Sequence, residues 1–224
     1  GSTGNIYGED IPTTDPSISG DFAEFMSWAD HVRRLKVRTN ADTPKHAAKA
    51  VEFGAEGIGL TRTEHMFFEG NRILKFRVMI LSDSEEERIA ALEAIKPFQK
   101  EHFVGIYEAM QERPVTIRLL DPPLHEFLRA TDEEFEELSK VMGKSVQELK
   151  IKARGLHELN PMMGHRGCRL AVSYPEIAKM QASAIIEAAL EVKKNKGYNI
   201  VPEIMIPLVG DPKEMKFVKE LIVE

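Results

Sequence analysis

The sequence has a single cysteine among its 224 residues, so no disulfide can join two points of the chain. That absence excludes a small domain held together by disulfides and suits a reducing compartment. The sequence also lacks any apolar run near the roughly 20 residues that a membrane-spanning helix requires. Its formal net charge of −6 argues against binding to nucleic acid or to an acidic membrane surface, since both need a basic face. The composition, 42% hydrophobic and 29% charged, is that of an ordinary globular protein.

Short apolar runs alternate with amphipathic stretches along most of the chain. The apolar runs have the length of strands and lie at 35–40, 57–60, 115–120 and 203–209. The amphipathic stretches predict helices at 21–32, 42–54, 84–95, 132–142, 146–157, 174–197 and from 211 onward. Continuously apolar strands separated by helices are typical of a parallel sheet covered by helices. The segment 160–175 fits either a short strand or a loop that opens a helix.

Local signals mark where several of these helices begin and end. Ser84, Thr131 and Ser145 each stand three residues before a glutamate, which is the spacing of a capping box. Pro97 lies within the apolar-periodic stretch that follows Ser84. We expect this proline to end one helix before another resumes, because proline removes a backbone hydrogen bond.

Polar and charged side chains gather where the predicted strands end. They are Arg38, Asn40, Arg62, Glu64, His65, Arg118, Asp121, Arg166 and Arg169. In a parallel α/β fold the carboxyl ends of the strands meet at one edge, where such proteins bind their ligands. Arginine forms paired hydrogen bonds with phosphate or carboxylate, so several arginines at one edge indicate an anionic substrate. An isolated arginine at a strand end is more often part of a surface ion pair, and the pattern alone leaves both interpretations open.

Cysteine and histidine give weaker signals. Cys168 lies three residues after His165, but a cysteine at the start of a helix more often packs as a small apolar side chain. His65, His125 and His165 are candidate acids or bases, and no two histidines have the spacing typical of a metal site. The glycine-rich stretch GAEGIG at 54–59 matches neither of the common nucleotide-binding patterns.

Four segments, taken in order, carry a resemblance to a known family. They are GLTRTEHMFF (59–68), TIRLLDPPLHEFL (116–128), NPMMGHRGCRL (160–170) and EIMIPLV (203–209). They resemble the phosphoenolpyruvate-utilising enzymes. The DPPLHEF continuation and the helical stretch after it resemble the dikinase branch of that family; the synthase and the phosphotransferase enzyme I stay as alternatives. Thr61 and Arg129 depart from the family pattern, which has a small cysteine-like residue and a proline at these positions.

The resemblance implies an α/β fold of the (β/α)8 TIM-barrel type, present here as about five β/α units with a helical insertion after the third strand. Residues 1–20 resemble the tail of a phosphohistidine domain and a linker, and residues 21–224 resemble a partial barrel that binds phosphoenolpyruvate or pyruvate. Enzymes of this branch convert ATP, phosphate and pyruvate to AMP, diphosphate and phosphoenolpyruvate. A mobile phosphohistidine domain carries the phosphoryl group from a separate ATP-binding domain, and magnesium (Mg2+) is the cofactor. The resemblance also implies a homodimer, in the cytoplasm or in an organelle.

The matching motifs assign roles to five residues. Arg62 and Arg118 would bind the phosphoryl group of the substrate, with Arg166 as a further substrate-binding arginine. Glu64 and Asp121 would orient these arginines, and we expect Glu64 to hold Arg62. The family's magnesium ligands and catalytic cysteine are expected downstream of this chain, so none is assigned here and the segment is expected to be inactive alone. The alternative from another class of function is that the chain is not part of an enzyme but a non-catalytic module that binds an anion or a partner.

Overall fold

The computed structural model describes residues 3–14, 16–68 and 71–224. The chain forms two compact units, Gly1–Lys36 and Val37–Glu224. The first unit holds helix α1 (Gly20–Val32), close to the helix predicted at 21–32. The assignment of residues 1–20 to a preceding domain stays a prediction, and residues 1, 2 and 15 lie outside the described residues. In the described part of the chain, no helix is both long enough and apolar enough to cross a membrane.

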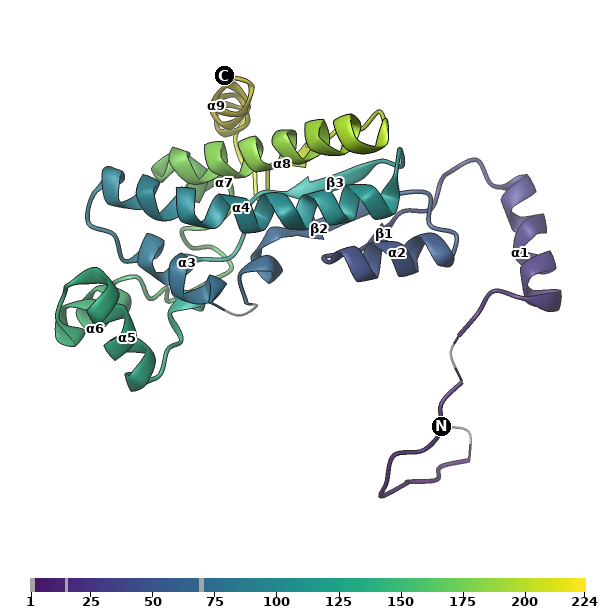
Figure 1. Cartoon of the computed structure of the whole chain (residues 1–224), viewed down its shortest axis with the longest axis horizontal. Helices are drawn as coiled ribbons and strands as arrows, with labels where there is room; N and C mark the ends of the chain where they lie inside the picture. Colours follow the sequence, from purple (N-terminus) through teal and green to yellow (C-terminus); the bar gives the residue numbers. More distant parts are fainter. Residues whose placement is uncertain (1–2, 15, 69–70) are drawn as a thin grey trace. The chain divides into compact units, whose positions relative to one another are not determined.

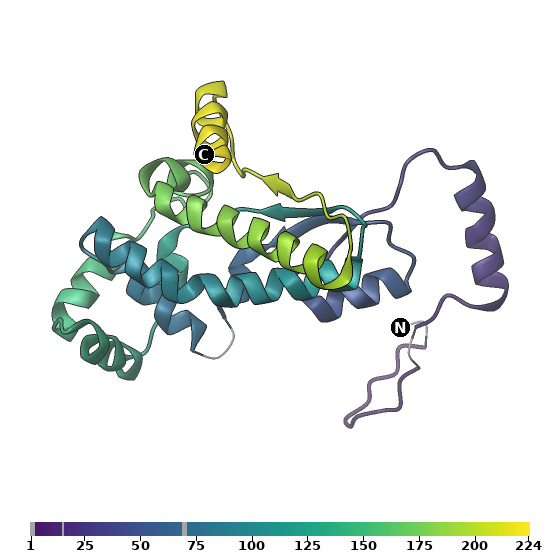
Figure 2. The same cartoon turned by 45° about the horizontal axis from the view of Figure 1, so that its top comes forward.

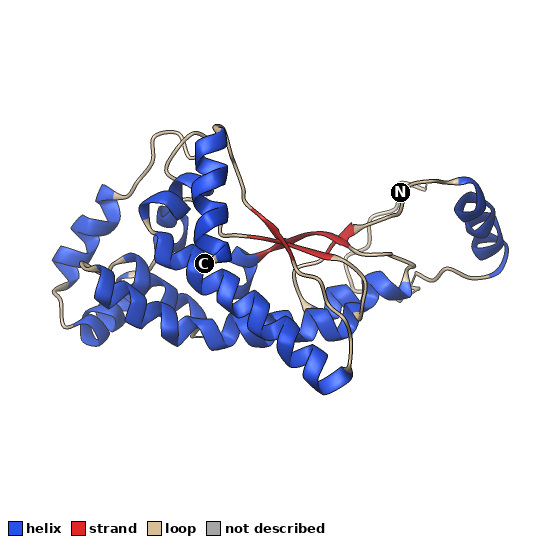
Figure 3. Cartoon of the chain, turned by 90° about the horizontal axis from the view of Figure 1, so that it is seen from above, coloured by secondary structure: helices blue, strands red, loops and turns tan. Residues whose placement is uncertain are grey.

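The second unit is built on a parallel sheet of four strands in the order β1-β2-β3-β4. The strands are β1 (Thr39–Asn40), β2 (Ile58–Arg62), β3 (Val115–Arg118) and β4 (Glu203–Met205). All neighbouring strands are parallel, which confirms the predicted α/β class. Figure 3 shows how little of the unit is strand (red) compared with helix (blue). Closure of the sheet into a barrel stays a prediction.

The segment 160–175 forms no strand, so the described residues contain four strands where about five units were predicted. Residues 160–167 form turns and lead into helix α7 (Cys168–Ser173). Gly167 adopts a φ of +59°, which lies outside the extended region of backbone conformation. The turn-forming residues of this segment, rather than its apolar residues, therefore determine its local structure.

Helices connect the strands and pack against one face of the sheet. They are α2 (Pro44–Glu52) between β1 and β2, α4 (Glu85–Met110) before β3, and α8 (Pro175–Lys196) before β4. Helix α9 (Pro212–Val223) follows β4 and packs against α7 and α8. Figure 2 shows α4 and α8 side by side along the sheet, where they make extensive contact. Ile58, Val115 and Ile117 of the sheet share an apolar core with these two helices. Burial of one such side chain contributes roughly 1.5–3 kcal/mol, so this layer holds the sheet in place.

Helix α4 continues through Pro97, where we predicted a break. A proline inside a helix costs about 3 kcal/mol. Packing along α8 offsets this cost, because α4 buries side chains on both sides of the proline, including Ile95 and Phe103. An ion pair from Lys96 Nζ to Glu187 Oε1, 2.7 Å long, joins the two helices beside the proline. Tertiary contacts therefore override the local signal.

A second apolar cluster holds the helical insertion. Helix α3 (Arg72–Ile80), which we did not predict, packs against the 3-10 helices η1 (Thr63–Phe67) and η2 (Leu124–Leu128) and against α5 (Asp132–Met142). Helix α6 (Val146–Gly155) follows α5, and the two lie together at one end of the unit (Figure 1). The rings of Phe67 and Phe76 stack with centroids 4.0 Å apart in this cluster.

Buried Arg77 fastens the insertion to α3. Its Nε donates to the carbonyl oxygen of Phe127 at 2.8 Å, and its Nη2 donates to the carbonyl oxygen of Arg129 at 2.9 Å. Its Nη1 donates to Glu134 Oε1 at 2.7 Å. One guanidinium group thus forms hydrogen bonds with η2, with the residue after η2 and with α5, and so positions the residues that follow η2.

The predicted helix caps form in part. The capping boxes at Thr131 and Ser145 are complete. At Ser84 the hydroxyl accepts a hydrogen bond from the backbone N–H of Glu87 at 3.1 Å, but the Glu87 carboxylate accepts from the backbone N–H of Asp83. Helix α4 therefore begins with one of the two hydrogen bonds of the predicted capping box, the one accepted by the Ser84 hydroxyl.

Candidate functional site

Two of the predicted arginines stand next to each other at the edge of the sheet. Arg62 is the last residue of β2, Arg118 is the last residue of β3, and their Cα atoms are register partners. Parallel strands end at the same edge, which is where α/β proteins form their ligand sites. The structure thus brings together two arginines that the sequence predicted would meet, while their role toward a substrate stays a prediction.

Asp121 joins Arg118 to the third predicted arginine. Arg118 Nη1 lies 3.0 Å from Asp121 Oδ2, and Arg166 Nη2 donates to the same oxygen at 2.7 Å. Arg118 also donates from Nη2 to Glu64 Oε1 at 2.5 Å. Both carboxylates are buried, so these ion pairs are shielded from water. Arg62, Arg118 and Arg166 therefore form one cluster at the strand ends.

The partner of Arg62 is Asp42, and the prediction that Glu64 holds Arg62 is wrong. Asp42 accepts hydrogen bonds from the backbone N–H of Arg62 at 2.8 Å and from its Nε at 3.0 Å, and its Oδ2 lies 2.8 Å from Arg62 Nη2. His65 Nδ1 contacts the same carboxylate at 2.8 Å. Glu64 faces Arg118 instead, from the first turn of η1, which follows β2. Asp42 was missed in the sequence analysis, although it lies two residues after the end of β1 and so meets the same rule as the other strand-end residues.

Opposing effects act on the pKa of Asp42. Burial raises this pKa. The hydrogen bonds from the backbone and side chain of Arg62 lower it by more than burial raises it, and His65 adds a smaller lowering effect. The net result is a pKa below the ordinary value for aspartate. Asp42 is therefore an anion at neutral pH and fixes the orientation of Arg62.

Several polar atoms at the cluster lack a hydrogen-bond partner among the described residues. They are Glu64 Oε2, Asp121 Oδ1, Arg118 Nε and Arg166 Nε, all buried. A buried polar atom left unpaired costs free energy, and natural proteins retain few of them. Their concentration at the strand ends is typical of a site that is completed by a ligand or by further protein groups.

The described residues do not fit a complete magnesium site. Within the described ranges, no group of three or more histidine, cysteine, aspartate and glutamate side chains is placed to hold a metal ion. Mg2+ binds oxygen ligands, but the two carboxylates that have an orphan oxygen, Glu64 and Asp121, already face the cationic guanidinium groups of Arg118 and Arg166.

Three residues predicted to converge with the cluster lie elsewhere. Arg38 precedes β1 and donates to Glu203 Oε2 at 2.6 Å, at the opposite end of the sheet from the strand ends. Asn40 is exposed at the end of the short strand β1. Arg169 lies in α7 and donates to the carbonyl oxygen of Gly164 at 3.1 Å. Strand β1 ends at Asn40, as predicted, but it is two residues long rather than the six predicted.

Cys168 behaves as a packed thiol, as predicted. It is buried, and its Sγ donates to the carbonyl oxygen of Leu208 at 3.0 Å. Burial, reinforced by Glu214, raises the pKa of the Cys168 thiol, so the thiolate needed for a nucleophile is disfavoured. Of the candidate histidines, His65 contacts the cluster through Asp42, whereas the ring of His165 packs beside Tyr174 with centroids 5.8 Å apart.

Gly167 allows the loop after β4 to approach the arginine cluster. A Cβ at this position would lie 2.9 Å from the carbonyl oxygen of Pro207 and 3.0 Å from Leu208 Cβ. We expect Gly167→Ala to lower the free energy of unfolding by about 1–3 kcal/mol more than Gly143→Ala, which serves as the control. Gly143 has open space around it and a left-handed backbone (φ +66°, ψ +22°), whereas Gly167 has φ +59° and ψ −131°, so the difference reports the close approach together with the more restricted backbone of Gly167. Urea unfolding of both variants measures the difference, and equal losses would contradict the close approach.

Comparisons with known proteins agree with this geometry. Residues 17–224 match the family model described as PEP-utilising enzyme, PEP-binding domain, where PEP is phosphoenolpyruvate. Pyruvate, phosphate dikinase of Clostridium symbiosum is 62% identical over 224 residues, which are 100% of this chain and 26% of that protein. The protein of the same name from Rhizobium meliloti (strain 1021) is 54% identical over 222 residues, 99% of this chain and 25% of that protein. A chloroplastic relative of that name from Mesembryanthemum crystallinum is 51% identical over 218 residues, 96% of this chain and 23% of that protein. The chain thus spans about a quarter of the length of these relatives.

Proposed function

The chain belongs to the family of PEP-utilising enzymes, and from this premise we propose that it is the PEP- and pyruvate-binding segment of a pyruvate, phosphate dikinase. The observation that carries the proposal is the cluster of Arg62, Arg118 and Arg166 at the carboxyl edge of the parallel sheet. In the proposed reaction, ATP, phosphate and pyruvate give AMP, diphosphate and PEP. Because the chain spans a quarter of its relatives, ATP binding belongs to other parts of such an enzyme.

The arginines act on the phosphoryl group as it moves between PEP and a histidine of a mobile domain. The transition state of phosphoryl transfer spreads negative charge over the oxygens of the transferred group, and fixed cations stabilise that charge. Arg62 and Arg118 bind these oxygens, and Arg166 binds a further oxygen of the substrate. Asp42, Glu64 and Asp121 hold the three guanidinium groups in place before the substrate arrives, so little reorganisation is needed during the reaction.

The exposed side of the sheet supports the TIM-type barrel as its architecture. Val115 and Ile117 of β3 face the helices, so Thr116 and Arg118 face the other side, where Thr116 Oγ1 contacts Glu203 Oε2 at 2.6 Å. A parallel sheet is ordinarily covered on both faces. Closure into a (β/α)8 barrel, with strands contributed by the rest of a longer protein, would cover this face.

The remaining parts of the proposed enzyme follow from the same family. Mg2+ would be bound by oxygen ligands outside this chain, because the described residues hold no complete set. The proposed partners are the phosphohistidine domain of the same enzyme and a second copy in a homodimer. The proposed location is the cytoplasm, with an organelle as the alternative, since one of the relatives is chloroplastic.

Direct binding of PEP tests the proposed function. We expect calorimetry to detect binding of PEP to the folded 224-residue chain, and Arg62→Ala to weaken it about tenfold or more, because a charge-assisted contact to phosphate is lost. Arg113→Ala is the matched control, since Arg113 lies just before β3 and far along the strand from the cluster. Equal affinities for the Arg62 and Arg113 variants would contradict the arginine site. In a longer protein that contains this chain and the proposed Mg2+ ligands, PEP binding that is the same with and without Mg2+ would favour a non-catalytic module.

A further inference from the structure

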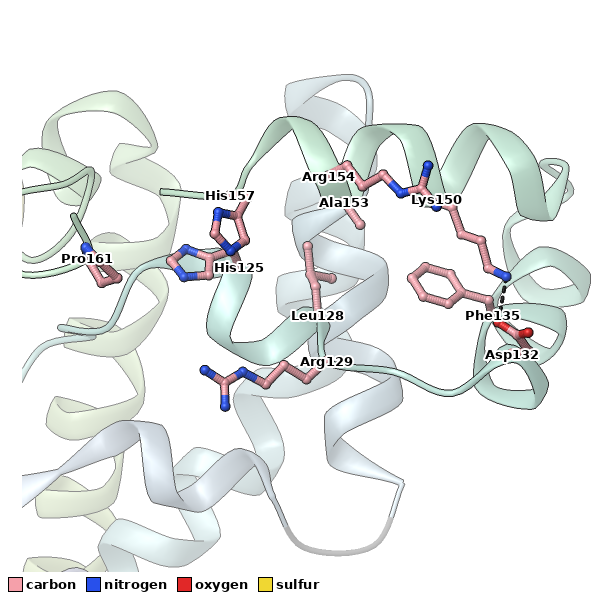
Figure 4. A pocket seen from close by; sticks show the side chains of 10 residues that line it. All are labelled: His125, Leu128, Arg129, Asp132, Phe135, Lys150, Ala153, Arg154, His157 and Pro161. Carbon is pink, nitrogen blue, oxygen red and sulfur yellow. Dashed lines mark hydrogen bonds and ion pairs between the residues drawn. The ribbon is translucent and has the colours of Figure 1, made fainter. Parts of the chain in front are cut away.

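A second candidate site lies in the helical insertion, apart from the arginine cluster. A cavity of about 720 Å³ is lined by ten residues from η2, α5, α6 and the loop after α6 (Figure 4). This volume falls within the roughly 300–1,000 Å³ that is usual for small-molecule sites. None of the residues that form the arginine cluster lines it, so it requires its own explanation.

The wall of the cavity is partly apolar. Leu128, Phe135 and Ala153 contribute to it, and Leu128 and Phe135 are buried. Figure 4 shows Leu128 and Ala153 between Phe135 on one side and a pair of histidines on the other. An apolar group of about the size of a ring would remove this surface from water, which favours binding.

The charged residues of the cavity are mostly cationic. Lys150 Nζ pairs with Asp132 Oδ1 at 2.6 Å, and Asp132 is the one carboxylate among the lining residues. Arg129 and Arg154 have no ion-pair partner in the part of the chain that the structure describes. This contrasts with the strand ends, where every arginine of the cluster faces a carboxylate. The cavity therefore carries two uncompensated positive charges beside an apolar wall.

A histidine pair adds polar groups at the end of the cavity near Arg129. The rings of His125 and His157 lie with centroids 5.2 Å apart and an interplanar angle of 38°. Nδ1 of His125 is buried and has no hydrogen-bond partner among the described residues. Figure 4 shows the Arg129 side chain extending to the same end as the two rings. An acidic group placed there would meet a guanidinium and imidazole nitrogens together.

We propose that this cavity binds a small organic anion that combines a ring-sized apolar body with a phosphate or carboxylate group. The body packs against Leu128, Phe135 and Ala153, and the acidic group pairs with Arg129 beside the histidines. The site is separate from the one that binds PEP in the proposed function. PEP is also a poor match for this cavity, because it has no ring-sized apolar part.

Phenyl phosphate is a suitable probe, with inorganic phosphate and phenol as its two halves. We expect calorimetry with the full chain to show phenyl phosphate binding at least about tenfold more tightly than either half, because only the whole probe makes both kinds of contact. Arg129→Gln is expected to weaken binding about tenfold, and Ala153→Phe to abolish it by occupying the apolar space in which the ring of the probe packs. Arg34→Gln, which removes an exposed arginine of the first unit, is the charge-matched control and is expected to leave binding unchanged. Circular dichroism verifies that each variant is folded.

Several results would overturn the proposal. One is affinity that stays the same in Arg129→Gln and Ala153→Phe. Another is inorganic phosphate binding as tightly as phenyl phosphate, which would show that the apolar wall contributes nothing. Loss of binding in Arg62→Gln alone would place the probe at the strand ends, and would then support the PEP site while excluding the cavity. A folded chain that binds no phenyl phosphate would exclude it directly, whatever the result with PEP.

Discussion

Replacing Arg118 with alanine is expected to slow phosphoryl transfer from PEP by about 10³-fold in a complete dikinase that contains this chain. Arg118 occupies the centre of the cluster, since it is the register partner of Arg62 and shares Asp121 with Arg166. Its loss removes one contact to the transferred group and leaves Glu64 without its cation, while Asp121 keeps only Arg166. The measurement is the single-turnover rate at which PEP phosphorylates the mobile histidine.

The same strand offers a matched control for this prediction. Arg113 lies just before β3, whereas Arg118 is its last residue, so the two arginines stand at opposite ends of one strand. Arg113→Ala is expected to keep a rate within about twofold of the unchanged enzyme, because surface substitutions seldom alter distant sites. Arg118→Lys keeps the charge but loses the planar fork, and an intermediate rate is expected. A single-turnover rate that is unchanged in Arg118→Ala would exclude Arg118 from the transfer step.

The sequence predicted the parts of this site that depend on the ends of long, regular strands. Arg62 and Arg118 end strands whose apolar pattern is clear, so the rule that parallel strands end at one edge was enough to bring them together. The α/β class followed from the same alternation. Arg166 was predicted from a motif, and the structure joins it to Arg118 through Asp121 although its segment is not a strand.

Other features depend on contacts between segments distant in sequence, and no local pattern could predict them. Pro97 stays inside α4 because α8, some 80 residues later, packs along both sides of it. The pairing of Asp42 with Arg62 depends on how the chain turns after β1 and β2, which sequence spacing does not specify. Arg38 was misplaced because its guanidinium pairs with Glu203 at the start of β4, a contact between segments distant in sequence. In each case tertiary packing decided between local alternatives.

Asp121 is expected to be the residue of the cluster whose loss most reduces stability. Its Oδ2 lies 3.0 Å from Arg118 Nη1 and 2.7 Å from Arg166 Nη2, and its backbone oxygen accepts from Gly167 N–H at 3.0 Å. Removing one partner of a buried ion pair typically costs about 3–5 kcal/mol, because the remaining charge stays buried without compensation. We expect Asp121→Ala to lower the free energy of unfolding by that amount, measured by urea unfolding of the chain. Asp132→Ala removes the carboxylate of an exposed pair with Lys150 and is expected to cost less than about 1 kcal/mol.

A double variant separates the loss of the carboxylate from the loss of packing. If the uncompensated guanidinium is what destabilises Asp121→Ala, then adding Arg166→Leu removes the charge that has lost its carboxylate, since Arg118 keeps Glu64. The double variant is then expected to be more stable than the sum of the two single losses predicts, with a coupling of about 1–3 kcal/mol. Strictly additive losses would mean that the Asp121–Arg166 pair carries no net interaction. In that case the short distance between them would reflect packing around the loop at Gly167, and the proposed role of Asp121 in holding Arg166 for the substrate would have to be abandoned.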